Sequence, residues 1–127
     1  MKAHAETTVD CPHRIECGAC SLLRKPYGEQ LEHKRRWLIE ALDESLRYDR
    51  RRVLPTLPSP QIESYRNRCK MTISTDRQRS SVLGYFQRRS REVVDAPHCG
   101  VLVSELLETT SLLRDLLNSP TRFPFAS

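Results

Sequence analysis

Residues 81–95 read SVLGYFQRRSREVVD and contain two short runs of strand-forming residues on either side of a polar turn. Valine, tyrosine and phenylalanine favour a pleated, half-buried backbone. We therefore expect one strand over residues 81–89 and another over 92–95, joined by a tight turn around residues 89–91. Because a short turn can join only antiparallel neighbours, this stretch predicts part of an antiparallel meander.

The preceding stretch, residues 64–75, reads SYRNRCKMTIST and alternates in polarity. A period of two indicates a strand with one face buried. The residues expected on the buried face are Tyr65, Cys69, Met71 and Ile73. Those expected on the outer face are Arg66, Arg68, Lys70 and Thr72. This strand would bring the antiparallel sheet to at least three strands.

Two helical patterns flank the strand region in the sequence. From Tyr27 to about Tyr48, apolar positions including Leu31, Leu38, Leu42 and Leu46 recur at helical spacing, and Pro26 suits the entry to a helix. A second leucine pattern follows Cys99 and ends near Pro120. Its leucine stripe is expected to pack on the core. Residues 49–61 contain three prolines and predict an extended connector between the first helix and the sheet.

These elements predict an α+β fold, an antiparallel sheet of at least three strands flanked by two helices. The chain has 127 residues, which suits one compact domain. Residues 1–10 are polar and are expected to be a disordered N-terminus, so the ordered domain would cover residues 11–127. The sequence contains neither a signal-peptide core nor an apolar run long enough for a membrane helix, and a reducing cytoplasm is the expected location.

The charge balance favours an anionic partner. The chain has 21 Lys and Arg residues against 16 Asp and Glu, a formal net charge of +5, and 17 of the cations are arginine. Arginine binds phosphate oxygens in pairs and stacks on bases, which suits RNA. The candidate RNA-binding residues are Arg66, Arg68 and Lys70 on the expected strand, extended by Arg89 and Arg91. The alternative is a charged sheet edge that only prevents aggregation.

Cysteines form the second candidate site. Residues 11–20 read CPHRIECGAC, which places Cys11, Cys17 and Cys20 close together, and Cys99 offers a fourth thiol. In a reducing compartment such a set is more typical of metal ligation than of disulfides. The C-x5-C-x2-C spacing with one remote cysteine favours a [4Fe-4S] cluster. Structural zinc is the alternative, with His13 or His98 as a substitute ligand.

Five segments, in order, resemble the N-terminal part of the RNA (uracil-5-)-methyltransferases, which methylate uridines in 23S rRNA and tRNA. They are CGAC followed by SLL, then YGEQLEHKRRWL, YRNRCKMTIS, LGYFQRRS and VVDAPHC. The resemblance is to the iron-sulfur branch of the family, and it implies that Cys11, Cys17, Cys20 and Cys99 ligate a [4Fe-4S] cluster. Only ten residues precede Cys11, so the chain is more similar to the 23S rRNA enzymes that lack an N-terminal oligonucleotide-binding barrel.

The resemblance also implies what the chain does not contain. In the family, the S-adenosylmethionine-binding domain carries the nucleophilic cysteine and the general base, and it would follow the equivalent of Ser127. We therefore assign no catalytic residue, and Cys69 is expected to be a small core residue. By itself the chain is expected to be inactive, with S-adenosylmethionine as the cofactor of the full-length enzyme.

The expected function is therefore the cluster-stabilised, RNA-binding portion of a 23S rRNA (uracil-5-)-methyltransferase-like protein. The alternatives are a stand-alone iron-sulfur or zinc RNA-binding protein and a redox sensor, neither with methyltransferase activity. Expected partners are RNA, most readily rRNA, and no membrane. The family resemblance implies that the first helix packs on the methyltransferase domain, so without that domain its apolar stripe would be exposed and would promote self-association.

Overall fold

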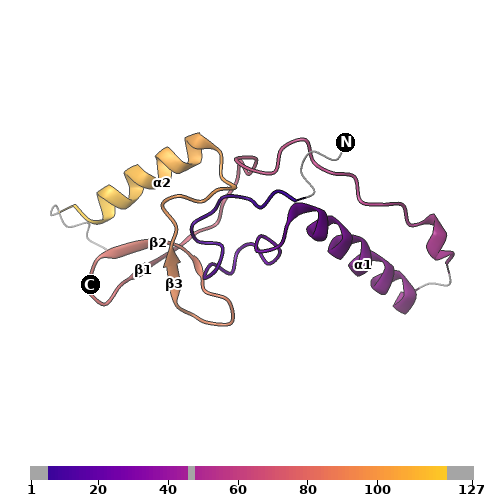
Figure 1. Ribbon diagram of the computed structural model, residues 1–127. Helices are drawn as coiled ribbons and strands as arrows, with labels where there is room; N and C mark the ends of the chain where they lie inside the picture. The colour runs from indigo at the N-terminus through magenta and orange to yellow at the C-terminus, as the bar shows by residue number, and fades with distance from the viewer. Residues whose placement is uncertain (1–5, 46–47, 120–127) are drawn as a thin grey trace. The chain divides into compact units, whose positions relative to one another are not determined.

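The computed structural model describes residues 6–45 and 48–119, and these residues form two helices, one short 3-10 turn and one sheet (Figure 1). In chain order the elements are α1 (Tyr27–Ser45), η1 (Arg50–Arg52), β1 (Thr72–Thr75), β2 (Ser81–Phe86), β3 (Val93–Asp95) and α2 (Ser104–Leu117). The chain divides into two compact units, one of Met1–Val9 and Leu22–Gln61, the other of Asp10–Ser21 and Ile62–Ser127. The α+β class is confirmed.

The second unit contains the sheet, whose strands follow the order β1-β2-β3 and are all antiparallel. Gly84 lies at its centre, opposite Thr72 of β1 and Asp95 of β3. A Cβ atom at Gly84 would overlap the carbonyl oxygen of Val94, so only glycine lets β3 approach this closely. The predicted meander is therefore confirmed, with β2 as its central strand.

The first strand is shorter than the alternation predicted. Its ladder covers Thr72–Thr75 instead of residues 64–75, and Arg66 instead forms an isolated parallel bridge with Leu102. The Arg66 amide donates to the Val101 carbonyl at 2.7 Å, and the Val103 amide donates to the Arg66 carbonyl at 3.1 Å. The β1–β2 ladder ends at Thr72 and Gly84, so it does not reach residues 64–66. These residues pair instead with the segment after Cys99.

The burial pattern in this segment also differs from the prediction. Tyr65 and Ile73 were expected on the buried face, but their side chains are 50% and 54% exposed. Arg66, expected on the outer face, is half-buried. A strict period of two holds only while one partner strand runs alongside, and here the partner changes between Arg66 and Thr72. The two halves of the segment therefore do not share one inner face.

Helix α2 is joined to the sheet by polar contacts. Arg114 donates to the Asp95 carboxylate at 2.9 Å and to the Leu83 carbonyl at 3.0 Å. Asn118, which follows the helix, hydrogen-bonds both the amide and the carbonyl of Ser81 at the start of β2. The predicted second helix is confirmed, and Figure 1 places it alongside the sheet.

The leucine stripe of α2 is only partly buried. Leu102, just before the helix, is fully buried, whereas Leu113 is 38% exposed and Leu116 is 48% exposed. The expectation that the whole stripe packs on the core is wrong. Strands of four, six and three residues offer too small a surface to cover a helix of 14 residues.

The first unit is built around α1, whose end at Ser45 is slightly earlier than predicted. Leu46 of the expected apolar stripe lies outside the described residues. Within the segment expected to be disordered, residues 6–10 are described: Val9 is buried, and the Thr7 carbonyl accepts from the Tyr27 amide at 2.9 Å. The proline-containing connector lies against α1, since the Thr56 hydroxyl donates a hydrogen bond to the Leu31 carbonyl at 3.0 Å.

Neither helix in the part of the chain that the structure describes combines the length and apolar character needed to cross a bilayer. Helix α1 does carry exposed apolar side chains, since Trp37 and Leu38 are each about half exposed. Of the stripe expected to be exposed, Leu38 is exposed, whereas Leu31 and Leu42 are half-buried.

Candidate functional site

The loop that carries the cysteine triplet is folded by its own backbone and fastened to the β2–β3 hairpin. The Arg14 amide donates to the Cys11 carbonyl at 3.1 Å, and the Cys17 amide donates to the His13 carbonyl at 2.9 Å. Cys17 also forms an isolated antiparallel bridge with Gln87. These turns bring the three cysteines of one short segment onto the end of the sheet.

Gly18 makes this attachment possible. Its amide donates to the Phe86 carbonyl at 2.9 Å, and a Cβ atom at this position would lie 2.7 Å from the same oxygen. A side chain would therefore push the loop away from β2. A glycine between two closely spaced cysteines predicts a tight loop around the site, and Gly18 occupies that position.

Cys99 reaches the triplet through a second close backbone approach. A Cβ atom at Gly100 would overlap the Asp10 carbonyl oxygen and would lie 3.2 Å from Cys11 Cβ. Cys11 and Cys99 are both buried, with 5% and 7% exposure, while Cys17 and Cys20 are half-buried. The structure therefore brings Cys99 beside the N-terminal loop.

The four thiols share one electrostatic environment. Burial is the main reason that the pKa values of Cys17, Cys20 and Cys99 are raised. Cys20 is additionally affected by Cys11, Cys17 and Cys99, each of which raises its pKa further. Each thiolate disfavours the ionisation of its neighbours. A cation that binds all of the thiolates at once therefore gives the largest stabilisation of their charged forms.

Within residues 6–45 and 48–119, no three His, Cys, Asp or Glu side chains form a group that could hold one metal ion. Zinc requires its ligands around a single point, whereas a [4Fe-4S] cluster spreads four cysteine thiolates over its irons. Four cysteines match the ligand number of either site, and these four interact electrostatically with one another.

Tyr85 and Arg66, which the cysteine pattern did not indicate, interact electrostatically with the same group of thiols. Burial, followed by the neighbouring Cys99 and Cys69, raises the pKa of Tyr85 to about 12. The Tyr85 hydroxyl is buried and has no hydrogen-bond partner. Burial lowers the pKa of Arg66. Its interactions with Cys20, Tyr65 and Tyr85 outweigh this effect, so the pKa is raised.

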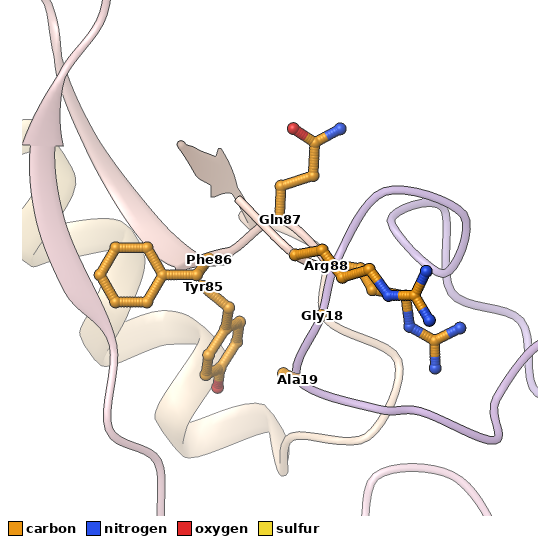
Figure 2. A pocket seen from close by; sticks show the side chains of 7 residues that line it. Gly18, Ala19, Tyr85, Phe86, Gln87 and Arg88 are labelled. Atoms are coloured by element: carbon orange, nitrogen blue, oxygen red, sulfur yellow. The ribbon is translucent and has the colours of Figure 1, made fainter. Parts of the chain in front are cut away.

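A cavity of about 350 Å³ lies beside this environment and is lined by Gly18, Ala19 and residues 85–89 (Figure 2). Figure 2 shows Tyr85 extending toward the level of Ala19, with Phe86 turned to the other side. Arg88 extends over the triplet loop, where its guanidinium donates to the Ser21 carbonyl at 3.1 Å. Arg88 therefore fastens the loop, a role that sequence reasoning missed.

The candidate RNA-binding cations do not all lie together. Arg68, Lys70, Arg89 and Arg91 are exposed, while Arg66 is half-buried and interacts electrostatically with Cys20. Arg89 has a φ of 59° and forms the hairpin turn between β2 and β3. Four of the five predicted cations are thus available to a ligand in solvent. The expected row of three successive outward cations is not formed.

Comparison with known proteins finds RNA methyltransferases. No family model matches the chain. It is 35% identical over 106 residues to an uncharacterized RNA methyltransferase of Nitratidesulfovibrio vulgaris, covering 84% of this chain and 23% of that protein. It is 32% identical over 117 residues to the 23S rRNA (uracil(1939)-C(5))-methyltransferase RlmD of Acidithiobacillus ferrooxidans, covering 90% of this chain and 26% of that protein.

A third relative is an uncharacterized RNA methyltransferase of Staphylococcus aureus, 26% identical over 110 residues. The chain spans about a quarter of the length of these curated relatives. Its homologues are thus named RNA methyltransferases, at modest identity.

Proposed function

We propose that this chain is the RNA-binding portion of a 23S rRNA (uracil-5-)-methyltransferase-like protein, held together by a [4Fe-4S] cluster. The observation that carries the proposal is the convergence of Cys11, Cys17, Cys20 and Cys99 from two segments far apart in the sequence. The similarity to RNA methyltransferases supports the same assignment. We propose a cytoplasmic location, where thiols remain reduced.

The cluster supplies a covalent cross-link between the N-terminal loop and the segment after β3. The four cysteines hold it as thiolates, and their burial limits access of water and oxidants to it. Cross-linking segments this far apart removes conformational entropy from the unfolded chain. Methyl transfer is not a redox reaction, so it does not require an electron from the cluster. A structural role for the cluster therefore fits the activity of the relatives.

The chain's own cations handle the RNA. Arg68, Lys70, Arg89 and Arg91 are exposed and can approach phosphate oxygens from solvent. In a longer protein, methyl transfer from S-adenosylmethionine to uracil would take place on residues outside this chain. The remainder of such a protein, or a second copy of the chain, would cover the exposed Trp37 and Leu38 of α1.

The test is the metal content of protein purified without air. We expect four iron atoms and inorganic sulfide per chain with broad visible absorption, because four thiolates bind one [4Fe-4S] cluster. Cys99→Ser should lose this iron. Cys69→Ser is the matched control, since Cys69 is a half-buried cysteine outside the ligand set, and it should retain the cluster. Stoichiometric zinc without iron, or full iron content in Cys99→Ser, would overturn the proposal.

A further inference from the structure

The starting observation is a buried hydroxyl group that has no partner. In the described part of the chain, the oxygens and nitrogens of buried side chains are unsatisfied at only two positions, and one of them is the Tyr85 hydroxyl. Leaving a buried donor unpaired is unfavourable, so native proteins rarely do so without a ligand or water at that point. The Tyr85 hydroxyl therefore indicates an acceptor that the polypeptide itself does not provide.

The surroundings of Tyr85 identify that acceptor. The side chain belongs to β2 and extends toward the level of Ala19, between Cys17 and Cys20 in sequence (Figure 2). Its electrostatic neighbours include Cys17 and Cys99, one thiol from each of the two cysteine segments. The hydroxyl makes no hydrogen bond to a cysteine sulfur, so its acceptor would be a group bound beside the cysteines, and the sulfide ions of a cluster accept hydrogen bonds because they carry negative charge.

Arg66 approaches the same thiols from a different segment. Its backbone is fixed by hydrogen bonds with Val101 and Val103, just after Cys99. Its side chain is half-buried and interacts electrostatically with Cys20 and Tyr85. The structure therefore holds a permanent cation beside a site whose four thiolates would give the cluster a net negative charge.

We propose that Tyr85 and Arg66 are outer-sphere positioning residues of the cluster: the Tyr85 hydroxyl donates a hydrogen bond to a sulfide of the cluster, and the Arg66 guanidinium offsets the negative charge of the cluster. This inference rests on the proposed function, because it requires the cluster. It moves Arg66 from the RNA-binding set to the cluster site. One-electron reduction adds a negative charge to the cluster, and both groups stabilise that charge, so both raise the reduction potential.

The experiment measures the midpoint potential of the cluster in air-free, full-length chain. Tyr85→Phe removes only the hydroxyl oxygen, and Arg66→Gln removes the charge. Both variants are expected to shift the potential to more negative values, while Arg66→Lys keeps a cation and stays closer to wild type. The controls are Tyr27→Phe, whose hydroxyl accepts from the Ser59 amide in the other unit, and Arg68→Gln, which changes an exposed arginine. The controls should keep the wild-type potential.

Iron content separates the two hypotheses. If wild-type protein binds no iron, the proposed function fails. If wild type and Tyr85→Phe both carry the full cluster with the same potential, the outer-sphere role of Tyr85 is overturned while the cluster assignment stands. An unchanged potential in Arg66→Gln would overturn the role of Arg66 at the cluster, and a reduced salt dependence of RNA binding in this variant would return Arg66 to the RNA-binding set. If Arg66→Gln does not assemble a cluster, Arg66→Lys decides: its failure to assemble a cluster as well would mean that the charge at this position is not what the cluster requires.

Discussion

At the scale of single residues, close backbone approaches decide whether the cysteine segments meet. Gly100 has no room for a Cβ atom, which would overlap the Asp10 carbonyl oxygen. We predict that Gly100→Ala destabilises the fold by about 1–3 kcal/mol, because Asp10 or Gly100 must move. The same movement separates Cys11 from Cys99 and should lower the iron content. Chemical denaturation and iron analysis of the same preparation measure both effects.

Gly28→Ala is the matched control for this substitution. Gly28 lies in the first turn of α1, in the other compact unit, where alanine favours a helix by up to about 1 kcal/mol over glycine. It should keep the iron content of the wild type. Full stability and full iron in Gly100→Ala would mean that the two segments tolerate a wider spacing than the backbone contact suggests.

At the scale of secondary-structure elements, Arg114 connects α2 to both β2 and β3. It donates to Asp95 and to the Leu83 carbonyl, and the Leu83 amide donates to the same carboxylate oxygen at 3.0 Å. We predict that Arg114→Ala lowers the free energy of unfolding by roughly 1–3 kcal/mol, because it leaves a partly buried carboxylate and a carbonyl with one partner fewer. Thermal or urea unfolding followed by circular dichroism measures this loss.

Glu108→Ala provides the comparison on the same helix. Glu108 is exposed, so its removal should change stability by no more than about 0.5 kcal/mol. Arg114→Lys should fall between the two, since lysine keeps the charge but cannot address two acceptors in a fixed fork. Equal stability of Arg114→Ala and Glu108→Ala would show that apolar packing alone holds α2 on the sheet.

At the scale of the whole molecule, the distribution of exposed cations determines how RNA binding responds to salt. Each phosphate contact to a single strand contributes about 0.7 to the slope of log affinity against log salt, so the double variant Arg68→Ala, Lys70→Ala should flatten the slope by about 1.4. Adding Arg66→Ala should flatten it no further, because Arg66 is half-buried and interacts electrostatically with Cys20. Fluorescence anisotropy with a uridine-containing single strand, titrated at several salt concentrations, gives the slopes.

A double variant in the other compact unit controls for net charge. Lys34→Ala, Arg36→Ala removes the same two charges from exposed positions of α1. Its slope should match that of the wild type if the RNA lies on the unit that contains the sheet. Equal flattening by both double variants would mean that RNA responds only to the overall charge of +5 and recognises no particular surface.

The type and order of the elements could be predicted from the sequence because they depend on short-range patterns. A helical period indicates α1 and α2, while short strand-forming runs around a turn indicate β2 and β3. The cysteine spacing likewise places Cys11, Cys17 and Cys20 close together, since residues within one loop are held close by the chain itself. These features require only neighbours in the sequence, so composition and spacing were sufficient.

Tertiary structure alone decided which way Arg66 and Tyr85 face. The alternation placed Arg66 outward, but the bridge to Leu102 replaces the expected partner strand, and the side chain is half-buried near Cys20. Tyr85 reads as one more apolar strand residue, but its hydroxyl is buried without a partner, and the side chain lines a cavity together with Gly18 and Ala19 of the cysteine loop. Both outcomes depend on contacts between segments far apart in the chain, and no local period in the sequence encodes such contacts.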